Sequence, residues 1–191
     1  MPRGFYEGNG RIVISVATPP VVATELNQIA AQFPQDDLYL FGHSLGGFIL
    51  AKAVAQLTFT PKKLVFVGIR HSYPPAGIRG MLRVLFKSPK TLIDGFFSAA
   101  APGTPFVNQH IEAIQSEWPP GRLQWGLSEL NEFMTPTQAA IYVHGDKDEI
   151  APIAEVQALS EKTGMPLIVI SDGGHLLDLD QVEAQVGHGA G

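Results

Sequence analysis

One serine in this chain stands in a setting that could make its hydroxyl a nucleophile. Ser44 lies in the run Gly42–Gly47, which reads GHSLGG and contains the pattern G-x-S-x-G. This pattern is typical of a nucleophilic serine on a tight turn between a strand and a helix. The apolar run Leu38–Phe41 predicts the strand, and residues Phe48–Leu57 predict the helix. The alternative is a glycine-rich turn with an incidental serine, and the flanking strand and helix favour the nucleophile.

The residues around Ser44 have physical reasons to be what they are. Because the turn is tight, we expect side chains at Gly42 and Gly46 to collide with neighbouring backbone. The N-terminus of the following helix points free N–H groups at the serine and favours negative charge there. The amide of Leu45 is therefore a candidate donor to the oxyanion that forms during acyl transfer.

A serine nucleophile needs a base, and the base needs an acid to orient it. Two aspartates, Asp146 and Asp148, follow the predicted strand Ala140–His144. Asp148 is the favoured acid because it closes the loop before the next helix, whereas Asp146 is better suited to stabilise the turn. His175 follows the predicted strand Leu167–Ile170 and two glycines, and it is the favoured base. The other five histidines lack this combination of chain order and strand-end setting.

The elements that must position these residues alternate along the chain. The predicted strands are short, nearly continuous apolar runs at Arg11–Val16, Leu38–Phe41, Leu64–Gly68, Ala140–His144 and Leu167–Ile170. Helical spacing is found at Val21–Phe33, Phe48–Leu57, Met81–Phe97 with a break near Ser88, Phe106–Glu117, Leu123–Phe133 and Ile153–Thr163. This order predicts a single α/β domain with a mostly parallel sheet covered on both faces. The helices between the third and fourth strands are too long for a simple crossover, so we expect an inserted helical cap at about residues 72–136.

The three motifs, in this order, resemble the α/β-hydrolase superfamily from about Arg11 to the C-terminus. The resemblance implies an α/β-hydrolase fold with a reduced sheet, with Ser44 as nucleophile, Asp148 as orienting acid and His175 as general base. It also implies a second oxyanion donor from a His-Gly loop near the N-terminus. Few residues precede the first predicted strand here, and we expect Phe5 to supply that amide from a remnant of the loop.

Composition limits the other classes of function. The chain has 191 residues, 45% of them hydrophobic and 16% charged, which is enough for one domain with a core. It has no cysteine, so disulfides, thiolate metal sites and a cysteine nucleophile are excluded. No histidine pair has metal-ligand spacing, so we expect no metal and no cofactor. The apolar runs are too short to cross a bilayer and no signal peptide is visible, so we expect a cytoplasmic protein that binds neither membrane nor nucleic acid.

Charge is unevenly distributed along the chain. The net charge is −5, yet residues 38–93 contain eight Lys and Arg and no acid. Among them Arg79, Arg83 and Lys87 are spaced i, i+4, i+8 and share one helix face. The stripe is either a solvated helix face or a docking site for an acidic partner.

A narrower resemblance bears on that partner. The stretch Leu123–Leu130 is similar to the end of the cap in pimeloyl-acyl-carrier-protein methyl ester esterases of biotin synthesis. This implies as substrate the methyl ester of a pimeloyl chain held on acyl carrier protein, and the basic stripe would dock that carrier protein. The prediction is thus a serine carboxylesterase acting through an acyl-enzyme on a small or carrier-bound acyl ester. The alternatives are a thioesterase on the same triad and a non-catalytic binding module on a decayed hydrolase scaffold.

Overall fold

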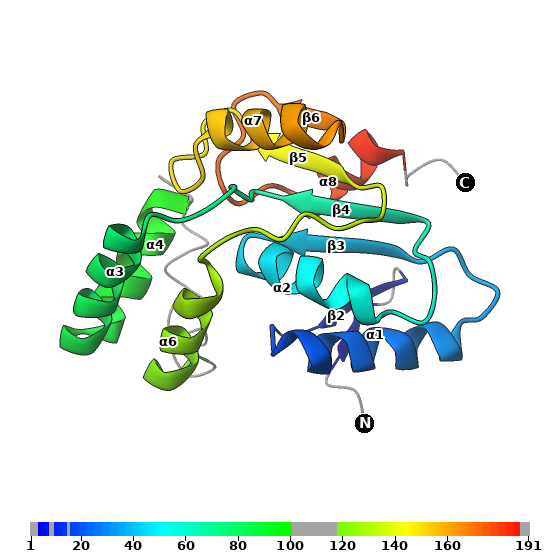
Figure 1. The fold of residues 1–191 in the computed structure, drawn as a ribbon, viewed down its shortest axis with the longest axis horizontal. Coiled ribbons are helices and arrows are strands. Elements are labelled where there is room, and N and C mark those ends of the chain that lie inside the picture. Colours follow the sequence, from blue (N-terminus) through cyan, green and yellow to red (C-terminus); the bar gives the residue numbers. More distant parts are fainter. Residues whose placement is uncertain (1–3, 8–9, 15, 101–117, 188–191) are drawn as a thin grey trace.

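The structure is a computed structural model that describes residues 4–7, 10–14, 16–100 and 118–187. Its central element is a four-stranded, fully parallel sheet (Figure 1). The strands, in spatial order, are β3 (Tyr39–His43), β4 (Lys63–Val67), β5 (Ile141–Gly145) and β6 (Leu167–Ile170). All four were expected; the ends of β6 agree with the prediction, and those of the other three strands differ by one or two residues. The helix expected at Phe106–Glu117 lies outside the described residues.

Both faces of the sheet are covered, as the apolar strands predict. The flanking helices are α1 (Pro19–Gln32), α2 (Leu45–Ala53), continued by a short 3-10 turn at Val54–Gln56, α7 (Ile153–Thr163) and α8 (Leu179–Val186). Successive strand residues point to opposite faces. In β4, Leu64 and Phe66 therefore join the core formed with α1, α2 and α7. Val65 and Val67 join the smaller core formed with α8, a helix that the sequence analysis did not predict.

An antiparallel hairpin forms a second, separate sheet near the N-terminus. Its strands are β1 (Gly4–Glu7) and β2 (Arg11–Ile14), and β1 pairs Phe5 with Val13. The expectation that Phe5 belongs to a loop is therefore wrong, because this short segment gains its hydrogen bonds from a partner strand. Arg11 joins the hairpin to α8 through Glu183, at 2.7 and 3.0 Å, and through Asp180.

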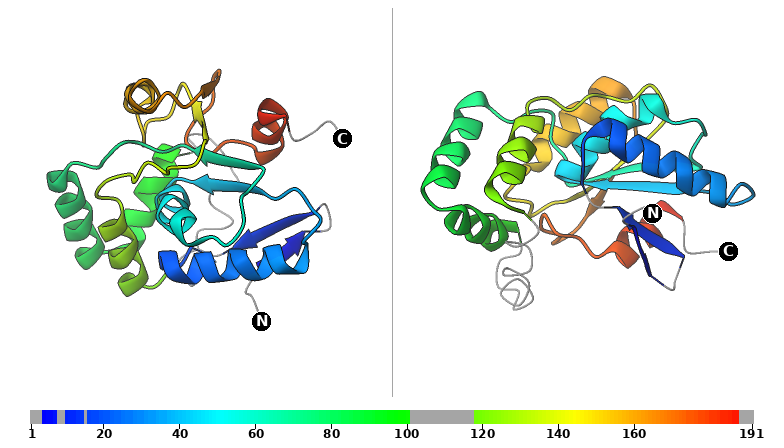
Figure 2. Two further views of the ribbon diagram at one scale, coloured as in Figure 1. Left: turned by 45° about the vertical axis from the view of Figure 1, so that its right-hand side comes forward. Right: turned by 90° about the horizontal axis from the view of Figure 1, so that it is seen from below.

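In the described part of the chain between β4 and β5, three helices lie within the range expected for a cap. They are α3 (Pro75–Lys87), α4 (Pro89–Ala100) and α6 (Pro120–Glu129), and they gather beyond the carboxyl ends of the strands (Figures 1 and 2). The expected break is confirmed, since Ser88 is extended between α3 and α4. However, α3 begins at Pro75, six residues before the expected start, because proline suits the first turn of a helix.

The two ends of this insertion are held together at its base. Ser72 and Glu132 form an isolated antiparallel β-bridge, and the N–H of Phe133 donates to the carbonyl of His71 at 2.8 Å. Phe133 is buried and packs edge-on against Phe66 of the sheet. The chain therefore leaves and re-enters the sheet at one place. No helix in the part of the chain that the structure describes is long and apolar enough to span a membrane.

Candidate active site

Ser44 occupies the turn between β3 and α2, as the sequence predicts. Its backbone has φ 51° and ψ −123°, an unusual conformation for a residue with a side chain. Such a residue costs about 1–3 kcal/mol and persists only when its surroundings fix it. Here the N–H of Ser44 donates to Val67 at 2.9 Å, and its carbonyl accepts from Gly47 at 2.9 Å. The turn directs the hydroxyl away from the sheet and towards the loops that follow β5 and β6.

The glycines at this turn are needed at Gly42 and Gly47, and the expectation for Gly46 is wrong. A Cβ at Gly42 would lie 2.8 Å from the Cα of Gly47, and one at Gly47 would lie 2.7 Å from Ile69. A Cβ at Gly46 would make only ordinary contact, at 3.8 Å from Val16. The close approach of β3 to the first turn of α2 therefore excludes side chains at Gly42 and Gly47. The prediction was right for Gly42 and named Gly46 in place of Gly47.

Ser44, His175 and Asp148 form a continuous hydrogen-bonded chain. The hydroxyl of Ser44 lies 2.9 Å from Nε2 of His175, and Nδ1 of His175 lies 2.8 Å from Oδ2 of Asp148. A carboxylate can only accept, so Nδ1 carries the hydrogen and Nε2 is free to accept from the serine. His175 is fully buried and Asp148 is 6% exposed, whereas Asp146 is exposed at the turn. The structure thus brings together the favoured acid, the favoured base and the serine.

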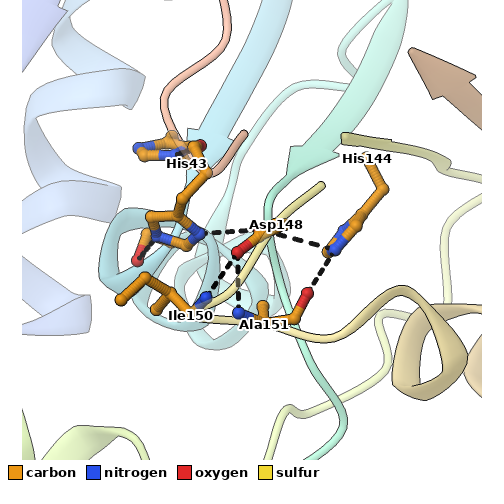
Figure 3. A network of polar contacts seen from close by, with 7 residues as sticks. His43, His144, Asp148, Ile150 and Ala151 are labelled. Atoms are coloured by element: carbon orange, nitrogen blue, oxygen red, sulfur yellow. Dashed lines mark hydrogen bonds and ion pairs between the residues drawn. The ribbon is translucent and has the colours of Figure 1, made fainter. Parts of the chain in front are cut away.

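The loop that holds Asp148 prepares its carboxylate to stay ionised. Oδ1 accepts from the N–H groups of Ile150 and Ala151, both at 2.8 Å (Figure 3). Oδ2 faces Nδ1 of His175 at 2.8 Å. Burial by itself raises the pKa of Asp148, but the hydrogen bonds from His175 and Ala151 outweigh it and hold the pKa below its usual value. A buried anion beside the imidazole stabilises the imidazolium that would form when the serine loses its proton.

His144 lies behind this acid loop. Its Nε2 is 2.6 Å from the carbonyl of Ala151 and 3.4 Å from Oδ2 of Asp148 (Figure 3). Burial lowers the pKa of His144, although the hydrogen bond to Ala151 opposes that shift. His144 is therefore a neutral imidazole that donates through Nε2.

His43 makes a hydrogen bond to the base that the sequence did not indicate. Its Nε2 lies 2.8 Å from the backbone carbonyl of His175, and the two rings pack with centroids 4.9 Å apart. Burial, followed by the charge of the nearby His175, lowers the pKa of His43 to about 4. The signal available in the sequence was the place of His43 at the end of β3, next to Ser44.

The backbone amide of Leu45 is placed to donate a hydrogen bond to an oxyanion at Ser44. Leu45 is the first residue of α2, and among the described residues its N–H has no acceptor. It stays a candidate for the oxyanion donor, supported by the positive end of the helix.

Two helices of the insertion, α4 and α6, contact residues of the site. Phe96 of α4 meets the ring of His175 edge-on at 5.8 Å. Gly126 of α6 lies so close to Leu45 that an added Cβ would be 2.9 Å from its side chain.

Within residues 4–100 and 118–187, apart from the short gaps, no group of three or more His, Asp or Glu is arranged to hold a metal ion. The chemistry that the assembled residues can perform is nucleophilic attack by a serine with proton transfer through a histidine. That chemistry suits acyl transfer.

The comparisons with known proteins agree with this fold. The sequence model of the Alpha/beta hydrolase family matches residues 6–186. An esterase from Exiguobacterium antarcticum superposes with a TM-score of 0.71 at 18% identity, over 96% of this chain and 77% of that one. A thermophilic esterase from Thermogutta terrifontis has a TM-score of 0.66 at 20% identity, over 95% and 74%. A bromoperoxidase from Bacillus anthracis has a TM-score of 0.65 at 17% identity, over 94% and 74%. No curated protein matches in sequence.

Proposed function

The chain belongs to the alpha/beta hydrolase family, and from that membership we propose that it is a serine carboxylesterase. The observation that carries the proposal is the unbroken contact from Ser44 through His175 to Asp148, at 2.9 and 2.8 Å. Two solved structures with the same fold are described as esterases, which supports an ester as the substrate class. An assembled triad with a buried, ionised acid also favours an enzyme over a binding module.

The first half of the reaction forms an acyl-enzyme. His175 takes the proton of the Ser44 hydroxyl, and the oxygen attacks the ester carbonyl to give a tetrahedral oxyanion. The amide of Leu45 donates to that oxyanion. As the C–O bond to the alcohol breaks, His175 returns the proton to the leaving oxygen. The alcohol departs and the acyl group stays on Ser44.

The second half releases the acid by the same groups. A water molecule enters, gives a proton to His175 and attacks the acyl carbonyl. When the bond to Ser44 breaks, His175 protonates the serine oxygen. Asp148 stabilises the imidazolium in both halves without being protonated itself.

A burst experiment tests this proposal. With p-nitrophenyl butyrate, the wild type should release about one equivalent of nitrophenol rapidly if deacylation is the slow step, followed by steady turnover. Ser44→Ala should do neither. Equal release by the two proteins would overturn the proposal. Turnover of a matched acyl thioester by the same preparation measures whether the enzyme prefers esters or thioesters.

We further propose that the acyl ester is presented by an acidic carrier protein, of the kind that a pimeloyl-acyl-carrier-protein methyl ester would require. Eight cations lie in the acid-free residues 38–93, and five of them have partners within the chain. These are Lys52, Lys62, Lys63, Arg70 and Lys90, which contact Glu129, Asp37, the carbonyl of Val186, Glu155 and Asp94. In the described part of the chain, the three cations left without a partner are Arg79, Arg83 and Lys87.

The three remaining cations share one exposed face of α3. Ile78 and Leu85 on the same helix are buried, so Arg79, Arg83 and Lys87 point to solvent. The neighbouring helices α4 and α6 contact His175 and Leu45, so α3 is the outer helix of the group. This face suits an acidic partner that approaches from outside.

Charge reversal tests the carrier proposal. The triple variant R79E/R83E/K87E should raise KM for an acyl ester on acyl carrier protein by about tenfold and leave a small ester unaffected. For a matched comparison, Arg83→Glu should raise KM for the carrier-bound ester more than Lys162→Glu, since Lys162 is exposed on α7. Equal effects of the triple variant on both substrates would remove the carrier and leave the esterase in place.

A further inference from the structure

Two histidines that take no part in proton transfer lie at the carboxyl ends of the strands. His43 is the last residue of β3, directly before the nucleophile. His144 is the penultimate residue of β5, four positions before the acid. His144 is fully buried, and both rings have pKa values lowered first by burial. An apolar side chain could fill the same space at these strand ends. The hydrogen bonds of the two imidazole rings therefore indicate their role.

His43 fixes the backbone of the base. Its Nε2 lies 2.8 Å from the carbonyl of His175, and because a carbonyl only accepts, the hydrogen is on Nε2. The ring of His175 is thus held at its Nδ1 by Asp148, while its backbone is held by a side chain from β3. One bond comes from the loop after β5 and the other from β3, and together they restrict how far Nε2 of His175 can move from the serine.

Gly68 leaves the space in which this contact forms. It follows β4 with φ 58°, in the left-handed region that favours glycine. A Cβ there would lie 3.3 Å from Nε2 of His43 and 3.4 Å from Cε1 and Nδ1 of His175. The end of the neighbouring strand therefore accommodates both rings.

His144 fixes the backbone of the acid loop by a hydrogen bond, as His43 fixes the backbone at the base. Its Nε2 donates to the carbonyl of Ala151 at 2.6 Å. The N–H of Ala151 in turn donates to Oδ1 of Asp148 at 2.8 Å. His144 therefore fixes the peptide group that fixes the carboxylate. Its Nδ1 is buried and has no partner among the residues that the structure describes, so a second proton there would be unsatisfied, which favours the neutral ring.

We propose that His43 and His144 are positioning residues, His43 for the backbone of the base His175 and His144 for the loop of the acid Asp148. Neither touches substrate or moves a proton. Each uses one N–H, aimed from a strand end at a backbone carbonyl, to keep a loop residue in register with Ser44. The inference rests on the proposed esterase, because the loss that it predicts is a loss of ester turnover.

The test separates the N–H from the bulk of the ring. Gln places an amide N–H close to the position of Nε2, whereas Met has similar length and no donor. His43→Met should lower kcat for p-nitrophenyl butyrate by about 10- to 100-fold with KM changed less than threefold, since misplacement of a catalytic group by about 1 Å costs on this scale. His43→Gln should recover most of that loss. His144→Gln and His144→Met should show the same order.

Three results would overturn the proposal. The first is wild-type kcat in a folded Met variant. The second is a Gln variant no better than the Met variant at both positions. The third is loss of folding by Gln and Met alike, seen in thermal unfolding, which would make the histidines purely structural. Ser44→Ala in the same assay keeps the two claims apart, because an inactive Ser44→Ala and an active wild type uphold the esterase whatever the histidine variants do.

Discussion

The carboxyl edge of the sheet and the outer face of α3 use polar side chains in opposite ways. At the edge, His43, His144, Asp148 and His175 all bond to protein groups, and three of them are buried. On α3, the three cations Arg79, Arg83 and Lys87 are exposed and have no partner among the described residues. The first region is complete within the chain, whereas the second has its charges available to another molecule.

This difference determines which perturbations each region should resist. Short, buried hydrogen bonds are insensitive to salt and intolerant of any change in donor or acceptor. Exposed charges tolerate substitution without loss of stability, and their effect on a partner fades as salt increases. Substitution, pH and salt should therefore affect the two regions differently.

Removing the negative charge of the buried acid should cost the most. Asp148→Asn places an amide opposite Nδ1 of His175, which favours the wrong tautomer, so kcat should fall by about 10³- to 10⁴-fold. Asp146→Asn is the matched control, because Asp146 is two residues away and exposed. Steady-state kinetics with p-nitrophenyl butyrate measures both. Comparable losses in the two variants would show that the wrong aspartate has been assigned.

Lowering the pH should destabilise the buried edge. The folded-state pKa of His43 is about 4 and that of His144 is also lowered, so below about pH 6.5 the unfolded chain takes up protons that the folded chain does not. The free energy of unfolding should therefore fall as the pH drops from about 6.5 to 4, by up to about 3 kcal/mol for His43. Urea unfolding at a series of pH values measures this. In His43→Met, the free energy of unfolding should depend less steeply on pH. An unchanged slope in that variant would contradict the assignment.

Adding one methyl group should change the free energy of unfolding in opposite directions in the two regions. Gly47→Ala would place a Cβ 2.7 Å from Ile69 and should lower the free energy of unfolding by about 1–3 kcal/mol. Gly80→Ala on α3 meets nothing within 4 Å and should raise it by about 0.5–1 kcal/mol, because alanine favours the helix. Urea unfolding compares them. A destabilised Gly80→Ala would mean that α3 is packed more tightly than its surroundings indicate.

The smallest expected effect is that of salt, which should act on carrier binding at α3 and leave turnover at the triad nearly unchanged. If α3 docks an acidic carrier, raising NaCl from about 50 to about 300 mM should increase KM for a carrier-bound ester by about threefold. The kcat of a small ester should stay within about 1.5-fold, because the triad is buried. A salt effect of the same size on both substrates would place the screened charges at the active site instead of on α3.

The sequence predicted best what depends on neighbours along the chain. The turn at Ser44, the strands around it and the order of Asp148 and His175 follow from local pattern and family resemblance, and the structure places the three side chains in contact. The break at Ser88 is also local, since the residue before a proline disfavours the helix.

What the sequence could not predict depends on segments that approach from far away. The need for glycine at Gly47 arises from Ile69, which lies in the segment after β4, and no local signal points to it. The strand β1 is stabilised by pairing with β2, and α8 by packing against the opposite face of the sheet. The hydrogen bond from His43 to His175 spans 132 positions, so only the folded chain shows that a histidine beside the nucleophile fixes the base.

The account rests on Ser44 being the nucleophile, and covalent trapping tests that claim most directly. After incubation with a fluorophosphonate, intact-protein mass spectrometry should show one adduct on the wild type, and peptide mapping should place it on Ser44. Ser44→Ala should gain no mass, and His175→Ala should be labelled far more slowly because the serine has lost its base. A wild type that stays unlabelled, or an adduct that persists in Ser44→Ala, would contradict the account.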